Sequence, residues 1–225
     1  MIVVIATTYE RQKNLNTTVM LLIVFLAVQV HQAFPHLEKN WLVNVVIVVT
    51  SKGLYEILIN LIYRVINSNE FMLRLYWGPL FLRGCWSYEY TLNGATYFGV
   101  WEFDQDTWNF QVVGNGLGAD FRSRTIVRSV SPLIPEQGGY FVLNRRNELS
   151  NDNALVFSKT TLLLNKPRRA WDLVMTMRAT TEIYGGPSDR QLHPNVVFER
   201  HPKAKSIEEV IEYLREKYAA SPTAS

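Results

Sequence analysis

The stretch WGPLFLRGCWSYEYTLNGATYFGVWEFDQDTWNF, residues 77–110, marks a change of pattern in the chain. Before it the sequence is apolar with helical patterning, and after it short aromatic runs alternate with tight turns. Trp86, Tyr88 and Tyr90 are spaced two apart, so on an extended strand their three rings point to one face. The stretch therefore predicts the beginning of a β-domain.

Turn signals divide this stretch into three strands. Asn93-Gly94 suits a two-residue hairpin loop, because both residues accept the positive φ angles that such a loop demands. Residues 104–106 are polar and predict a second turn, which leads into a strand over 107–113. In the run between the two turns, one side of the strand carries Tyr97, Gly99, Trp101 and Phe103.

Short alternating runs separated by the turn residues Gly, Asn, Asp and Pro continue to about residue 200. Further strands are predicted over residues 122–129, 139–144, 154–164, 171–179 and 196–200. About eight antiparallel strands favour a small closed β-barrel over 77–200, which removes exposed edges and can hold one small ligand. Residues 206–218 then predict an amphipathic helix that opens on a capping box and packs on the barrel or on a second subunit.

Two apolar segments precede the β-domain. After a tail over 1–16, residues 17–34 have an unbroken apolar core, and residues 41–63 are long enough to cross about 30 Å of hydrocarbon as a helix. Trp41 and Tyr63 fall where interfacial aromatic residues belong. We expect a transmembrane hairpin of two helices over 17–66. A signal-peptide core and a soluble helical hairpin are the alternatives.

Lys52 and Glu56 interrupt the second apolar segment. They are four residues apart and so share one face of a helix, where they can partly neutralise each other. The pair is compatible with a self-satisfied contact to another transmembrane helix, or with burial in a soluble hairpin. It is also compatible with a membrane or oligomer seam, since charges inside a membrane tend to be functional.

The distribution of Lys and Arg around the two segments predicts the membrane topology. Two cations precede the first segment, one lies between the segments and three follow the second: Arg11 and Lys13, then Lys39, then Arg64, Arg74 and Arg83. The positive-inside bias places the N-terminus and the β-domain in the cytoplasm, as a multi-pass protein.

Composition narrows the class of ligand. The net charge of +3 and the pI near 8.9 are compatible with an anionic ligand or lipid surface, but they are far from the footprint of a protein that binds DNA or RNA polymers. Cys85 is the only cysteine, so no intrachain disulfide can form, and we expect a buried thiol.

No catalytic constellation is recognisable, so we expect a protein that is not an enzyme and has no cofactor or metal. The four histidines have no metal-ligand spacing and are predicted in surface loops: His31, His36, His193 and His201. The glycine-rich run over 114–118 has the wrong spacing for a dinucleotide loop and predicts a flexible connection between strands.

Binding chemistry is better represented. Arg122, Arg124 and Arg128 alternate along one predicted strand, and Arg145-Arg146 ends another, so guanidinium groups can reach the barrel lumen or its rim. A ligand with phosphodiesters and bases needs such donors together with aromatic faces for stacking. The candidate ligand-binding residues are Trp86, Tyr88, Tyr90, Trp101, Arg124 and Arg128. Aromatic barrel core and solvated arginines on the outer face are the alternative.

Domain order and two strands together resemble a known family. Two N-terminal membrane segments, the strand RGCWSYEY (83–90), the strand YFGVW (97–101) and a small β-rich domain resemble the two-transmembrane β-barrel effectors of bacterial cyclic-oligonucleotide-based antiphage signalling systems (CBASS). The resemblance covers residues 17–179.

The resemblance implies an antiviral defence effector of the bacterial inner membrane. A cognate nucleotidyltransferase makes a cyclic dinucleotide, the cytoplasmic barrel binds it, and the chain forms a homo-oligomer whose hairpins disrupt the membrane. The infected cell then dies, which is abortive infection. The alternative is a lipocalin-like, membrane-anchored carrier or sensor of an apolar ligand, with its G-x-W-x-Y strand lining the pocket.

Overall fold

The computed structural model of the 225-residue chain describes residues 8–33, 41–92, 94–136, 138–149, 155–165, 172–184 and 190–219. The chain divides into two compact units, Met1–Tyr76 and Trp77–Ser225. Each unit is described by itself.

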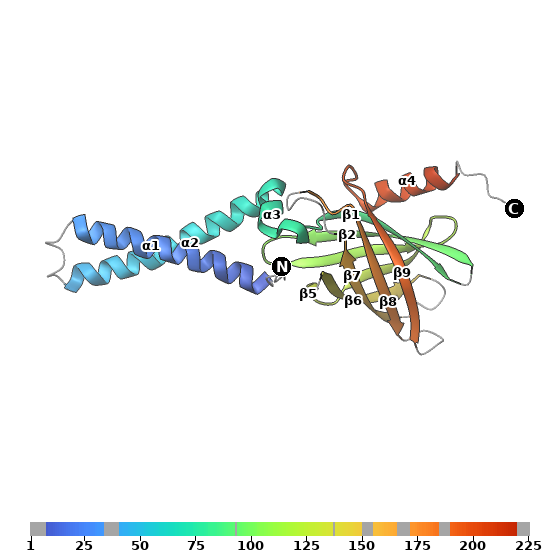
Figure 1. Cartoon of the computed structure of the whole chain (residues 1–225), viewed down its shortest axis with the longest axis horizontal. Helices are drawn as coiled ribbons and strands as arrows, with labels where there is room; N and C mark the ends of the chain where they lie inside the picture. Colours follow the sequence, from blue (N-terminus) through green and yellow to red (C-terminus); the bar gives the residue numbers. More distant parts are fainter. Residues whose placement is uncertain are drawn as a thin grey trace. The chain divides into compact units, whose positions relative to one another are not determined.

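The first unit is helical. It contains α1 (Thr8–Ala33) and α2 (Trp41–Ser68), which lie side by side (Figure 1), and most of α3 (Glu70–Trp77). The seam between α1 and α2 is a small apolar cluster of Val19, Ile23, Ile59 and Tyr63. The Tyr63 hydroxyl also donates a hydrogen bond to Asn16 Oδ1 at 3.0 Å. The two long helices therefore form a hairpin with its own contacts.

One described segment is long and apolar enough to cross a membrane. It is Glu10–Val30, 21 residues with a mean hydropathy of 1.5, and most of its apolar surface is exposed. The second predicted span, 41–63, lies within α2. Judged by length and hydropathy over the described residues, it is not a second candidate span. The side chains of residues 41–48 lie outside the described part of the chain. The structure thus supports a single candidate span by length and composition.

The second unit is an antiparallel β-barrel (Figure 1). In the described part of the chain its strands are β1 (Gly84–Leu92), β2 (Ala95–Gln105), β3 (Phe110–Leu117), β4 (Ser123–Ser129), β5 (Ile134–Glu136), β6 (Gly139–Glu148), β7 (Leu155–Leu164), β8 (Thr176–Tyr184) and β9 (Arg190–Arg200). The order β4-β3-β2-β1-β9-β8-β7-β6 is closed by pairing of β4 with β6, while the short β5 pairs beside β6. The prediction of a barrel of about eight strands is confirmed.

Several strand predictions were wrong in their bounds. The strand predicted over 107–113 is β3, which continues to Leu117, and the one predicted over 139–144 is β6, which continues to Glu148. The strand predicted over 171–179 is β8, which begins at Thr176, and the one predicted over 196–200 is β9, which begins at Arg190. β9 contains Pro194 and then Asn195, whose φ is 63°, and the β8–β9 register shifts there. This bulge interrupts the alternation that marks a strand, which is why the sequence indicated only its second half.

The glycine-rich run over 114–118 is not a flexible loop, because β3 continues through Leu117. Gly99 of β2 and Gly114 of this run make room for aromatic rings. A Cβ on Gly99 would lie 2.2 Å from Cζ of Tyr88, and a Cβ on Gly114 would lie 2.4 Å from Cδ1 of Trp101. The absence of these side chains lets both large rings fold into the lumen against the neighbouring strands.

One end of the barrel, at which residues 77–84 enter β1, is filled. Gln105 lies fully buried there, accepts hydrogen bonds from the backbone N–H groups of Leu82 (2.7 Å) and Arg83 (3.2 Å), and donates to the Leu80 carbonyl. The buried guanidinium of Arg200 donates to the Arg83 carbonyl and lies over the Trp86 ring, 5.6 Å from its centroid. We call this the closed end of the barrel.

The predicted C-terminal helix is α4 (Ile207–Ala219), and it packs on the barrel. Ser206 Oγ accepts a hydrogen bond from the Glu209 N–H at 3.4 Å, as the capping box predicts. The apolar stripe of α4 covers the outer face of β1, β2 and β3, where Cys85 lies 2% exposed. The side chains that make this contact are Ile207, Val210 and Leu214 on Cys85, Val100 and Leu117. The buried thiol is confirmed, and burial raises its pKa to about 11.

The glycine contacts generate a stability prediction. Gly99→Ala forces a methyl group against the buried Tyr88 ring, so we expect the barrel to lose about 1–3 kcal/mol of unfolding free energy. Gly116→Ala is the matched control on the neighbouring strand, because its Cβ would be 3.3 Å from Thr125 Cβ and should cost less. Urea denaturation of the full chain in detergent measures both. Equal losses in the two variants would contradict this packing.

Candidate functional site: the barrel lumen

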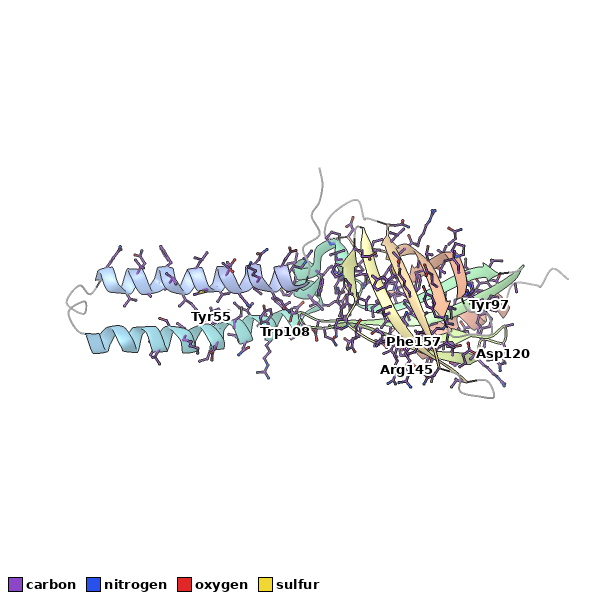
Figure 2. All side chains as sticks on the ribbon, turned by 90° about the horizontal axis from the view of Figure 1, so that it is seen from below. Tyr55, Tyr97, Trp108, Asp120, Arg145 and Phe157 are labelled. Carbon is purple, nitrogen blue, oxygen red and sulfur yellow. The ribbon has the colours of Figure 1, made fainter. Side chains whose placement is uncertain are left out.

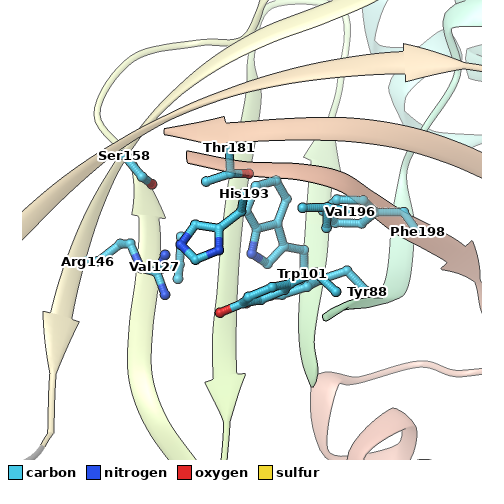
Figure 3. A pocket seen from close by; sticks show the side chains of 10 residues that line it. Tyr88, Trp101, Val127, Arg146, Ser158, Thr181, His193, Val196 and Phe198 are labelled. Atoms are coloured by element: carbon cyan, nitrogen blue, oxygen red, sulfur yellow. The ribbon is translucent and has the colours of Figure 1, made fainter. Parts of the chain in front are cut away.

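A cavity lies inside the barrel, above the filled closed end. It is lined by side chains from seven strands: Tyr88, Tyr90, Trp101, Val127, Arg146, Ser158, Thr181, His193, Val196 and Phe198. Figure 3 shows Arg146, His193, Tyr88 and Trp101 directed toward the same space. The cavity therefore has one aromatic wall and one polar wall.

The aromatic wall comes from β1, β2 and β9. Tyr88 contacts Trp101 edge to face with ring centroids 5.8 Å apart, and Phe198 lies 5.1 Å from Tyr88 and 5.0 Å from Trp101. Tyr90 stacks with Tyr97 at 5.2 Å. These rings fix one another in place and present flat apolar faces to the lumen.

The polar wall comes from β6, β7 and β8. Arg146 lies on the inward face of β6, opposite Val127 of β4. Thr160 and Thr181 are joined by a hydrogen bond of 3.0 Å between their hydroxyl oxygens, and Ser158 is 3% exposed. Hydroxyls and one guanidinium thus face the aromatic wall.

Several buried polar atoms of the lumen lack a hydrogen-bond partner among the described residues. They are both ring nitrogens of His193, both amide atoms of Asn144 and Nε1 of Trp101. Asn144 is fully buried, two residues before Arg146 on the same face of β6, and His193 is 4% exposed. Unpartnered buried polar atoms are costly, and they mark places where a ligand or water supplies the missing hydrogen bonds.

The cavity is small, with a volume of about 20 Å³. Such a volume holds roughly one water molecule. A larger ligand can therefore enter only if the aromatic or polar wall moves.

Burial decides the protonation states at the site. Desolvation, with the nearby Arg146 guanidinium as a smaller cause, lowers the pKa of His193, so its imidazole is neutral at pH 7. Desolvation raises the pKa of Tyr90 to about 12 and also raises that of Tyr88. Among the described residues that line the cavity, the groups available for hydrogen bonding are therefore neutral except for one cation, Arg146.

The predicted ligand-binding residues separate into three groups. Tyr88, Tyr90 and Trp101 line the cavity. Trp86 is fully buried near the closed end, where its Nε1 donates to the Leu82 carbonyl. The third group, Arg124 and Arg128, is exposed on the outer face of β4, and Arg124 pairs with Asp120 at 3.1 Å. Only the first group is brought together in the lumen.

Arg146 and His193 are lumen residues that the sequence pattern did not single out. Arg146 follows Arg145, which is exposed on the outer surface together with Phe157 (Figure 2), and only the strand register decides which arginine points inward. The prediction of surface loops was wrong for His193, which lies in β9 and is buried. His201 lies in the loop directly after β9 and is partly exposed, with its Nε2 2.7 Å from Ser87 Oγ. His31 and His36 have side chains outside the described residues.

Lys52 and Glu56 are exposed on α2, one turn apart, outside the seam with α1. Both side chains are described, and no ion pair joins them. In the first unit they are thus available to a neighbouring molecule. No group of three His, Cys, Asp or Glu side chains that could hold a metal ion occurs in the described ranges.

Comparison with known proteins found no matching family model, no matching curated protein and no matching solved structure.

The neutral His193 generates a pH prediction. Its pKa in the folded chain lies below that of the unfolded chain, so the unfolded chain binds more protons between the two values. We expect the free energy of unfolding to fall as the pH drops from 7.5 through 6.5 and below, by at most about 1.4 kcal/mol per pH unit from this one group.

His193→Gln should remove part of this pH dependence, measured by urea denaturation of the full chain in detergent at pH 7.5, 6.5 and 5.5. His201 contributes in the same direction, because burial also lowers its pKa, so His201→Gln gives the size of the other part. A His193→Gln variant with the whole wild-type slope would show that this imidazole is not desolvated.

Proposed function

We propose that the chain is a membrane-anchored receptor and effector without enzymatic activity, whose barrel lumen binds a cyclic dinucleotide. The observation that carries the proposal is that Arg146 and the rings of Tyr88, Tyr90 and Trp101 line the same cavity. A guanidinium donates paired hydrogen bonds to phosphate, and aromatic faces stack on bases.

The unpartnered polar atoms support the same proposal. A phosphodiester has acceptor oxygens for Trp101 Nε1 and for the N–H of the neutral His193 imidazole, and a sugar hydroxyl can pair with the Asn144 amide. The ligand would thus supply hydrogen bonds that these buried groups lack in the described residues.

The small cavity gives the proposed receptor a way to signal. A cyclic dinucleotide is far larger than 20 Å³, so its binding requires the walls to separate. A ligand shifts a conformational equilibrium by its difference in affinity for the two states. If the barrel binds ligand only in a widened conformation, ligand binding would stabilise that conformation. The widened barrel would in turn promote assembly of several copies of the chain.

The output we propose is assembly in the bacterial inner membrane. Glu10–Val30 supplies one candidate span, and α2 would supply the second, with the N-terminus and barrel in the cytoplasm. The exposed Lys52 and Glu56 would pair between neighbouring copies at a seam in the membrane. Disruption of the membrane would kill an infected cell in which a cognate nucleotidyltransferase makes the ligand.

Arg146 tests the receptor. Arg146→Gln should weaken binding of a cyclic dinucleotide at least about ten-fold, because one charged hydrogen-bonding partner of the phosphate is lost. Arg124→Gln is the matched control, since Arg124 is exposed on the outer face. Calorimetry of the full chain in detergent against cyclic di-AMP, cyclic di-GMP and cyclic di-UMP measures both. Wild-type protein that is folded and binds none of them would end this proposal.

A lipocalin-like carrier of an apolar ligand is the second candidate. The exposure of Arg124 and Arg128 favours it, because neither arginine adds charge to the lumen, and so does the aromatic wall. The same Arg146→Gln variant separates the two candidates. A carrier would bind the apolar probe N-phenyl-1-naphthylamine in competition with its ligand, with an affinity that Arg146→Gln leaves unchanged.

The seam generates a cellular prediction. Replacing Lys52 and Glu56 together by Leu should keep the chain in the membrane, because charges at the centre of a helix cost about 2.5–3.5 kcal/mol each on insertion scales. It should abolish ligand-dependent toxicity if the pair joins neighbouring copies. Membrane fractionation and viability of cells that make the ligand are the measurements. Full toxicity of the double variant would show that the pair has no role in assembly.

A further inference from the structure

A groove lies on the outside of the barrel where β1 and β9 separate. The two strands pair only from Trp86 with Arg200 to Glu89 with Val197, although β1 continues to Leu92 and β9 begins at Arg190. The bulge at Pro194 and Asn195 ends the pairing. Beyond it, the β1–β2 hairpin and the first half of β9 have no β-ladder between them.

The groove has a volume of about 510 Å³, against about 20 Å³ for the lumen. The residues that carry the argument are Glu89, Tyr90, Thr91, Phe98, Asn195 and Tyr218. Tyr90 also lines the lumen, where its ring lies 4.8 Å from that of His193. One residue thus borders both spaces, and the groove has the room that the lumen lacks.

The charge of the groove is the opposite of that of the lumen. Glu89 is exposed and is the only charged side chain among the described residues that line the groove, whereas Arg146 is the cation of the lumen. A phosphate group would be repelled by Glu89 and attracted by Arg146. The groove therefore suits a neutral part of a ligand that carries hydrogen-bond donors.

The aromatic residues of the groove fit a planar ring. Phe98 and Tyr218 contact each other with centroids 4.6 Å apart, and the Tyr218 hydroxyl donates to Glu89 Oε2 at 3.0 Å. Burial, followed by the bond to Glu89, raises the pKa of Tyr218 to about 12, so this hydroxyl keeps its proton at pH 7. An ionised carboxylate has roughly four acceptor sites, so Glu89 can accept further donors from a ligand.

We infer that the groove is a base-binding subsite that selects nucleobases with an amino group, namely adenine, guanine or cytosine. It deepens the proposed receptor function, on which it rests: one base of the cyclic dinucleotide lies in the groove and donates to Glu89, while a phosphate lies past Tyr90 beside Arg146. Uracil is disfavoured, because its one N–H lies between two carbonyl oxygens that would face the carboxylate.

The test is a change of base preference. The full chain in detergent is titrated by calorimetry with cyclic di-AMP and cyclic di-UMP, which differ only in their bases. We expect wild-type protein to bind cyclic di-AMP at least ten-fold tighter. Glu89→Gln should reduce that ratio to about two-fold or less, because the amide both donates and accepts.

Two further variants complete the design. Glu136→Gln, on the exposed edge strand β5, is the matched control and should leave the ratio unchanged. Thr91→Trp places a large ring in the groove from an exposed position and should weaken the binding of cyclic di-AMP at least ten-fold. This variant tests the subsite even if Glu89→Gln does not fold. Thermal unfolding monitors each variant.

The outcomes separate the groove from the receptor. Binding that depends on Arg146 but not on Glu89 or Thr91 overturns the subsite and leaves the receptor in place, as does a wild-type preference for cyclic di-UMP. If neither cyclic dinucleotide binds, the receptor proposal fails and adenosine alone tests the groove by NMR titration. Adenosine binding that Glu89→Gln abolishes supports the subsite, and no adenosine binding overturns it.

Discussion

The close approach of Tyr88 to Gly99, and of Trp101 to Gly114, is the contact on which the barrel interior depends. These rings fill the lumen only because the facing residues of β2 and β3 lack a Cβ. The same contact removes nearly all free volume and fixes an aromatic wall opposite Arg146. Stability and the proposed binding function therefore share residues, and a ligand that enters must compete with the packing that holds the barrel together.

The buried polar groups of the lumen lower the stability that this aromatic packing provides. His193 and Asn144 are buried with side-chain atoms that have no partner among the described residues, which weakens the folded state. A fold that keeps such groups next to Arg146 is suited to a ligand that satisfies them. The closed end is different, because Gln105 and Arg200 there bind backbone carbonyls and N–H groups. This contrast favours the half of the lumen lined by Arg146 and His193 as the half that responds to ligand.

The sequence predicted the barrel and the C-terminal helix well, because alternation, turn residues and a capping box are local signals. It predicted for the same reason that Trp86, Tyr88 and Tyr90 share one face of their strand, and the structure shows that this face is the inward one. It did not identify the inward arginine. Arg145 and Arg146 are neighbours, so their facing follows from the register of β6 with β4 and β7, which no local pattern contains. The bulge at Asn195 likewise hid half of β9, together with His193 and the separation of β9 from β1.

A structure of the chain with a bound cyclic dinucleotide would show whether the lumen is the binding site. We expect a phosphate within hydrogen-bond distance of Arg146, with the rings of Tyr88 and Trp101 displaced from their positions over Gly99 and Gly114. A ligand held on the outer face by Arg124 and Arg128, with the lumen still filled by its own side chains, would contradict binding in the lumen.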